Sequence, residues 1–136
     1  MKNETFNLNA QAIKRLRDMG KAAFADPEHY DQDKFSPFMP ECGCLLFFDQ
    51  RNQGESIEDG FFSTVIRVSE ELGIPSSGLN YEPIFGPVDM WPAEFKRRYK
   101  RARSPKGRAK VAMANIEYFI AQHSTAASRR AAAKLA

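Results

Sequence analysis

The sequence predicts a mainly α fold with a small β element. Two observations support this class. Four segments repeat apolar residues at helical spacing between residues that start or stop helices, and one short apolar run has the length of a strand. The chain has 136 residues, the usual size of one domain with one hydrophobic core. We therefore expect about four helices, arranged around a central one, and a short buried strand.

The first helix is predicted over residues 9–24. Asn9 suits the N-cap position, and the Asp-Pro-Glu sequence at 26–28 ends the helical pattern. Apolar and small residues recur at helical spacing between these limits: Ile13, Leu16, Gly20, Ala23 and Phe24. This spacing puts them on one face, which we expect to lie against the core.

The second helix is predicted over residues 57–72. A serine–aspartate capping pattern at 56–59 precedes it, and the Gly-Ile-Pro sequence at 73–75 stops it. Its apolar stripe consists of Ile57, Phe61, Val65, Val68 and Leu72. Because Phe62 and Ile66 widen the stripe, we expect this helix to contact neighbours on two sides and to be the central helix of the fold.

Two further helices are predicted over 90–103 and 105–122. The first places four residues on one face: Trp91, Phe95, Tyr99 and Ala102. Ser104 and Pro105 suit the N-cap and first positions of the next helix. Its inward face consists of Ala109, Ala112, Met113, Ile116, Phe119 and Ile120. The two helices follow each other through a tight turn and form a helical corner.

The β element is predicted over residues 44–48. The run Cys-Leu-Leu-Phe-Phe is continuously apolar and lies between Gly43 and Asp49, which is typical of a strand covered on both faces. A strand needs a partner, and the segments 5–8 and 80–85 are the candidates. We therefore expect a small sheet beside the helices.

We predict a single globular domain over residues 1–122, which contains the predicted helices and strand. Residues 123–136 form an alanine-rich extension whose ending, Lys-Leu-Ala, resembles a vector-encoded linker, so its cations receive little weight. The sequence has no apolar run of the roughly 18 residues that a membrane-spanning helix needs, and its start lacks the apolar segment of a secretory signal. We therefore expect a soluble, cytoplasmic protein.

Few residues suggest catalysis or metal binding. Cys42 and Cys44 could supply two metal ligands, but a closed structural zinc site needs four. The chain has no second pair of cysteines, and only His29 and His123 remain as imidazole ligands. Buried small side chains explain the cysteines better, because free cysteine is among the most buried residue types. The sequence has no phosphate-binding glycine loop, no nucleophile elbow and no calcium-binding loop. We expect no metal, no cofactor and no catalytic residue, and an enzyme is the least favoured class.

Charge is the most informative feature of the chain. Residues 1–94 contain eight Lys or Arg and sixteen Asp or Glu, a net charge of −8, whereas residues 95–136 contain twelve and one, a net charge of +11. Nine cations fall within 96–110, which we call the basic segment. Its candidate binding residues are Lys96, Arg97, Lys100, Arg101, Arg103, Lys106, Arg108 and Lys110.

These cations predict binding to a polyanion such as DNA or RNA, or pairing with an acidic protein surface. The aromatic face of 90–103 would dock on the core and leave the cations in solvent, and the start of the next helix would add backbone N–H donors. Contacts would be mainly to phosphate, because no Asn or Gln lies among the arginines to recognise base edges. The alternative is a protein-interaction module whose basic segment pairs with acids of its own or another chain.

A homodimer is predicted from the helix over 105–122. Val111 and Tyr118 lie seven residues apart, opposite the inward face, with Ala114 beside them. A second apolar patch on one helix indicates a second neighbour. We expect Val111, Ala114 and Tyr118 to contact a second copy of the chain.

Overall fold

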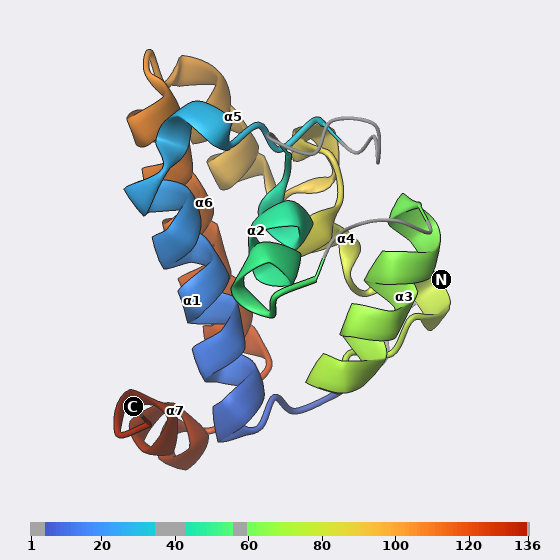
Figure 1. The fold of residues 1–136 in the computed structure, drawn as a ribbon. Coiled ribbons are helices and arrows are strands. Elements are labelled where there is room, and N and C mark those ends of the chain that lie inside the picture. The colour runs from blue at the N-terminus through green and yellow to red at the C-terminus, as the bar shows by residue number, and fades with distance from the viewer. Residues whose placement is uncertain (1–4, 35–42, 56–59, 136) are drawn as a thin grey trace.

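The chain folds into helices and connecting segments in a computed structural model that describes residues 5–34, 43–55 and 60–135 (Figure 1). Seven α-helices occur in these ranges: α1 Ala10–Ala25, α2 Leu45–Asn52, α3 Phe61–Leu72, α4 Glu82–Phe85, α5 Ala93–Arg101, α6 Pro105–Gln122 and α7 Ala126–Ala133. Short 3-10 helices cover Pro27–His29, Ser77–Leu79 and Val88–Met90. The described chain is therefore mainly α, but it has seven α-helices where about four were predicted, and the predicted β element is not among its elements.

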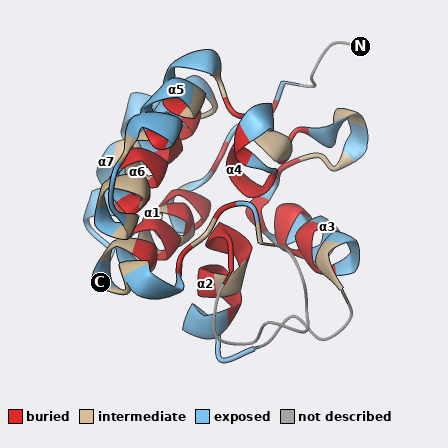
Figure 2. Cartoon of the chain, turned by 90° about the horizontal axis from the view of Figure 1, so that it is seen from above, coloured by how far each residue is buried: buried red, intermediate tan, exposed pale blue. Residues whose placement is uncertain are grey.

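The central helix is α1, which contacts α2, α6 and α7. Its N-terminus is fixed by Asn9, whose side chain accepts a hydrogen bond from Ala12 N at 2.8 Å. One face of α1 is fully buried, with Ile13, Leu16 and Met19 each at 0% exposure. The buried residues of α1, α2 and α6 face one another in a common core (Figure 2). Burial of this stripe holds α1 in the middle of the fold.

Helices α1 and α6 are antiparallel. Leu8 N, just before α1, donates to the carbonyl of His123 at the end of α6 at 2.7 Å. Near the middle, a Cβ on Gly20 would lie 2.9 Å from Ile116 Cδ1, so the absent side chain lets the two helices approach closely. The two helices come from opposite ends of the sequence and form the main helix pair of the core.

The predicted strand over 44–48 is wrong, because this segment lies in α2. Cys44 takes the N-cap position with an extended backbone, and the helix begins at Leu45. A short apolar run cannot distinguish a buried strand from a buried helix, since neither needs a polar face. Of the proposed partner segments, 5–8 is extended without belonging to a strand and 80–85 contains α4; no strand occurs in the described residues.

The prediction that the helix over 57–72 is central is also wrong. Helix α3 lies at the edge of the molecule, far from α7 (Figure 1). Phe62 is 70% exposed and Ile66 is 40% exposed, so the two side chains that widened the apolar stripe point outward. Only the face with Val65, Val68 and Leu72 is buried. The predicted capping pattern at 56–59 lies outside the described residues.

A ring of polar side chains attaches α3 to α1 and α2. Arg15 donates to Asp49 through two nitrogens and to Glu71 Oε1 through Nη1 at 2.9 Å. Arg67 donates to Gln50 Oε1 at 2.6 Å and contacts Glu71, and Gln50 Nε2 donates to Asp49 Oδ2 at 3.1 Å. Asp49 and Gln50 are buried, so this ring satisfies polar groups that would otherwise lack partners.

Helix α7 completes the described chain. Thr125 caps it by accepting a hydrogen bond from Ser128 N at 3.1 Å, and Ala132, at 4% exposure, is buried in the core. The helix lies across the end of α1 at the bottom of Figure 1. None of the described helices combines the length and apolar character needed to cross a membrane.

Candidate polyanion-binding surface

The basic segment lies at the corner between α5 and α6. Helix α5, shorter than the predicted helix over 90–103, buries Phe95 and Tyr99 at 6% and 7% exposure, and Trp91, just before the helix, is 4% exposed, so the predicted aromatic face is buried. The Trp91 and Tyr99 rings meet edge to face with centroids 5.5 Å apart. Because this face is fixed, the cations of α5 must extend from the other side. Lys96 is half-buried and Arg97, Lys100 and Arg101 are exposed.

The turn and first turns of α6 carry the remaining cations. Ser104 caps α6 by accepting from Gly107 N at 3.0 Å. That amide is thus not open to a phosphate, which weakens the expectation of backbone donors at this helix start. Arg103, Lys106 and Lys110 are exposed and Arg108 is half-buried. The Lys106 ammonium lies 5.1 Å from the centroid of the Phe24 ring of α1, which positions it over the α1–α6 contact.

Most cations of the basic segment have no acidic partner among the described residues. Lys100 pairs with Asp89 at 2.9 Å, and its hydrogen bond lowers the pKa of that carboxyl. Arg98 approaches Glu94 at 3.8 Å. No ion pair to a described acid forms at the other seven: Lys96, Arg97, Arg101, Arg103, Lys106, Arg108 and Lys110. Their positive charge is available to an external anion.

Several described acids in the rest of the molecule pair with cations elsewhere. Six described carboxylates accept from cations that lie outside the basic segment: Asp18, Asp26, Asp49, Glu55, Glu71 and Glu117. Their partners are Lys14, Arg15, Arg17, Arg51 and Arg67. The sequence left open whether the basic segment pairs with acids of its own chain, and the described residues form only two such pairs.

Helix α1 adds cations that the sequence analysis did not assign to this surface. Lys14, Arg17 and Lys21 follow one another at spacings of three and four, which puts them on one face. Arg17 donates to Glu117 of α6 at 2.9 and 3.0 Å, and this hydrogen bonding raises the pKa of Arg17. Spacing alone could have revealed this row, but not that it adjoins the basic segment.

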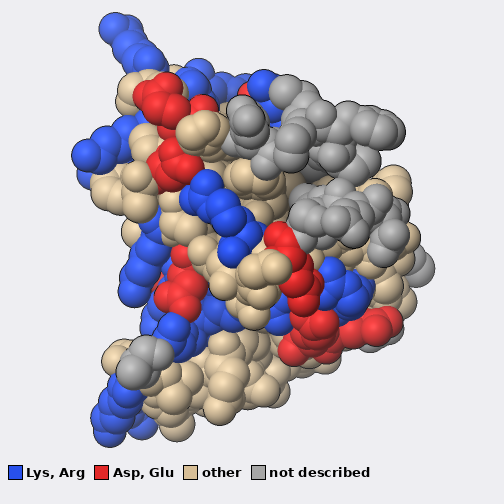
Figure 3. Space-filling view, viewed as in Figure 1, with Lys and Arg blue, Asp and Glu red and all other residues tan. Residues whose placement is uncertain are grey.

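The antiparallel register brings the two rows together. Arg17 meets Glu117, and seven residues further along α1, Phe24 meets Lys106. Lys21 of α1 and Lys110 of α6 both lie between these two contacts along the helix pair. We call the five cations Lys14, Arg17, Lys21, Lys106 and Lys110 the basic seam. In Figure 3, Lys and Arg side chains follow the left edge of the molecule with some acids among them, and a further cluster of acids lies toward α3.

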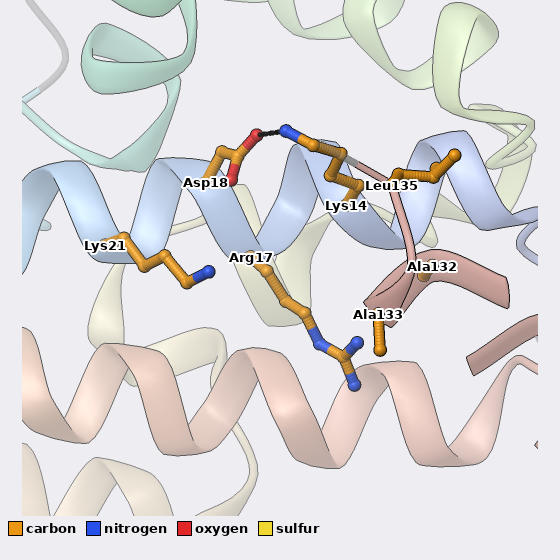
Figure 4. Close-up of a pocket in the computed structure, with 7 residues that line it drawn as sticks. All are labelled: Lys14, Arg17, Asp18, Lys21, Ala132, Ala133 and Leu135. Atoms are coloured by element: carbon orange, nitrogen blue, oxygen red, sulfur yellow. Dashed lines mark hydrogen bonds and ion pairs between the residues drawn. The ribbon is translucent and has the colours of Figure 1, made fainter. Parts of the chain in front are cut away.

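A pocket of about 420 Å³ lies at the α7 end of the basic seam. Its polar wall comes from α1 and consists of Lys14, Arg17, Asp18 and Lys21, and its apolar wall consists of Ala132, Ala133 and Leu135. Lys14 pairs with Asp18 at 2.5 Å. Figure 4 shows the Arg17 and Lys21 side chains extending from α1 into the space beside α6. The pocket combines cationic groups with a small apolar surface.

The three residues proposed as a dimer contact differ in exposure. Val111 is 7% exposed, because α5 covers this side of α6, and Ala114 is half-buried. Tyr118 is 43% exposed, with its ring 5.4 Å from Phe95. Part of the apolar patch seen in the sequence therefore belongs to the α5–α6 contact within one chain.

The cysteine and histidine residues lie apart from the basic segment. Cys44 is buried, and this burial raises the pKa of its thiol to about 11, while Cys42 lies outside the described residues. His29 Nδ1 lies 2.7 Å from Asp26 Oδ1, and the His123 ring stacks on Phe6 with centroids 4.1 Å apart. Within the described part of the chain, no three His, Cys, Asp or Glu side chains gather as a metal site would require.

No family model matches the chain, and no curated protein or solved structure matches it.

Proposed function

We propose that this chain is a non-catalytic cytoplasmic protein that binds DNA or RNA through phosphate contacts of the basic segment. The observation that carries the proposal is the pairing pattern: seven of its cations have no described acidic partner, while six described carboxylates outside the basic segment pair with cations elsewhere. A row of cations on a fixed helix face places several positive groups along one phosphate backbone. Recognition is of phosphate and not of base sequence.

The test is binding of labelled duplex DNA, single-stranded DNA and RNA, measured by fluorescence anisotropy over a range of salt. Each phosphate neutralised contributes about −0.9 to the log–log salt slope on duplex DNA and about −0.7 on a single strand. Arg103→Gln with Lys110→Gln removes two unpaired, exposed cations and should make the slope shallower by about two units, equally for unrelated sequences. Absence of binding by the native protein at low salt contradicts the proposal.

A matched variant separates local contacts from net charge. Adding Glu70→Lys to the two substitutions restores the native net charge of +3. Glu70 suits this purpose because it is an exposed acid of α3, a helix that lies on the side away from the basic seam. If the basic segment is the contact surface, this triple variant still binds as weakly as the double variant. Recovery of native affinity would show that overall charge governs the interaction.

The second candidate function is homotypic association, and the exposed residues of α3 favour it. Phe62 and Ile66 lie one turn apart on its outer face, and two antiparallel copies of this face would set each Phe62 against the partner copy's Ile66. Light scattering coupled to size exclusion decides the mass. A dimer that persists in Phe62→Ser but is lost in Tyr118→Glu would assign the contact to the α6 surface, and the opposite result would assign it to α3.

A further inference from the structure

The pocket between α1 and α7 lies on the same face as the basic segment, at the other end of α6. Glu117, which holds Arg17, is eleven residues beyond Lys106, a separation of about 16 Å along the helix. That distance equals about five steps of a nucleic-acid strand at about 3.4 Å each. A strand held at the α5–α6 corner can therefore follow the basic seam and reach the pocket.

The polar wall has cationic groups that no described acid occupies. Lys21 has no ion pair with a described acid, and Arg17 uses Nε and Nη2 for Glu117, which leaves Nη1 without a partner among the described residues. Lys14 is neutralised by Asp18 in a half-exposed pair of low stability. Lys21 Nζ and Arg17 Nη1 are therefore the donors for a phosphate oxygen, and both side chains extend into the same space (Figure 4).

The apolar wall indicates more than a bare phosphate. The pocket's volume of about 420 Å³ lies within the range of about 300–1,000 Å³ that small organic ligands occupy. Ala132, Ala133 and Leu135 present small apolar surface, and Asp18, the carboxylate among the lining residues, pairs with Lys14. The flat face of a sugar or base can lie on such a surface, whereas the paired and stacked bases of a duplex are not free to do so.

We propose that this pocket seats one nucleotide of a single-stranded nucleic acid, with its phosphate on Lys21 and Arg17 and its sugar or base against Ala132, Ala133 and Leu135. The inference rests on the proposed function, since the basic segment holds the rest of the strand. It assigns the pocket the role of selecting single strands over duplexes.

Two variants of the full chain test the pocket, with a third as control. Lys21→Gln removes the free cation, and Ala133→Trp fills the pocket without changing charge. Ala127→Trp is the control, because Ala127 is an exposed alanine of the same helix that does not line the pocket. Circular dichroism and melting temperature establish that each variant folds. The ligands are labelled oligothymidylate and a duplex of equal phosphate number.

Single-strand affinity should fall about tenfold in Lys21→Gln, through loss of one charge-assisted contact, and in Ala133→Trp, through exclusion of the nucleotide from the pocket, while Ala127→Trp binds like the native protein. Duplex affinity should change less in Ala133→Trp. Equal single-strand affinity in all three variants, with loss in Arg103→Gln/Lys110→Gln, overturns the pocket inference and leaves the proposed function intact. Failure of the native chain to bind either ligand overturns both.

Discussion

Asp49 on α2 accepts two hydrogen bonds from the guanidinium of Arg15 on α1, from Nε to Oδ1 at 2.8 Å and from Nη2 to Oδ2 at 2.9 Å. The Asp49 side chain is 1% exposed and that of Arg15 is 19% exposed. Hydrogen bonding to Asp49 raises the pKa of Arg15, so the guanidinium stays charged in the fold. A two-point contact of this kind fixes the orientation of both helices.

Removing the cation of this pair should destabilise the protein strongly. In Arg15→Leu, Asp49 is left as a buried charge whose one remaining side-chain partner among the described residues is Gln50, and we expect a loss of about 3–5 kcal/mol in the free energy of unfolding. Arg17→Leu is the matched control on the same helix, because its partner Glu117 is 53% exposed, and it should cost at most about 1 kcal/mol. Urea unfolding measures both, and equal losses would contradict a buried, structural ion pair.

The position of α3 can be tested by comparing its two faces. Phe62→Ser should leave the free energy of unfolding unchanged within about 0.5 kcal/mol, because the ring is 70% exposed. Val68→Ala should cost about 1–3 kcal/mol, because Val68 is fully buried. Thermal unfolding of the two variants distinguishes an edge helix from a central one. A large loss in the free energy of unfolding in Phe62→Ser would show that the outer face of α3 is buried.

The thiol of Cys44 should be unreactive in the folded protein. It is buried, and this burial raises its pKa to about 11, so almost no thiolate is present at pH 8. In a Cys42→Ser background, Ellman's reagent should modify Cys44 only after urea unfolds the chain. Rapid stoichiometric reaction without urea would show that α2 does not bury this residue.

Stability should decrease as the pH falls below about 6.5 because of His123. Burial lowers the pKa of His123 in the fold from its ordinary value of 6.5. The unfolded chain therefore binds a proton at a pH where the folded chain does not, and protonation favours unfolding. His123→Gln should flatten this part of the pH profile, measured by urea unfolding between pH 5 and 8. An unchanged slope would assign the pH dependence to other groups.

The helices that carry their own start and stop residues could be predicted from sequence. Ser104 and Pro105 fix the start of α6, and the predicted range 105–122 is confirmed. The run at 44–48 carries no such information, since the same apolar residues suit a buried strand or a buried helix. The exposure of Phe62 could not be predicted either, because a helix stripe shows which residues are apolar but not which neighbours cover them.

The candidate site, too, could be predicted from the sequence only in part. The cations of the basic segment are adjacent in sequence, so their density alone identified them. Lys21 and Lys110 are distant in sequence, and only the antiparallel register of α1 and α6, visible in the Arg17–Glu117 and Phe24–Lys106 contacts, places both along the same helix pair. The apolar wall of the pocket depends on where α7 lies, which no local pattern in an alanine-rich segment specifies.

The pairing of α1 with α6 has a consequence for how the protein is made. Residues of this pair, such as Arg17 and Glu117, are 100 positions apart, so a ribosome synthesises most of the chain before α1 meets its main partner. Until then the side chains of Ile13, Leu16 and Met19 have no complete core to enter. Such long-range contacts slow folding and leave apolar surface open to aggregation. A nascent chain that stops before Pro105 should therefore depend on a chaperone to remain dispersed.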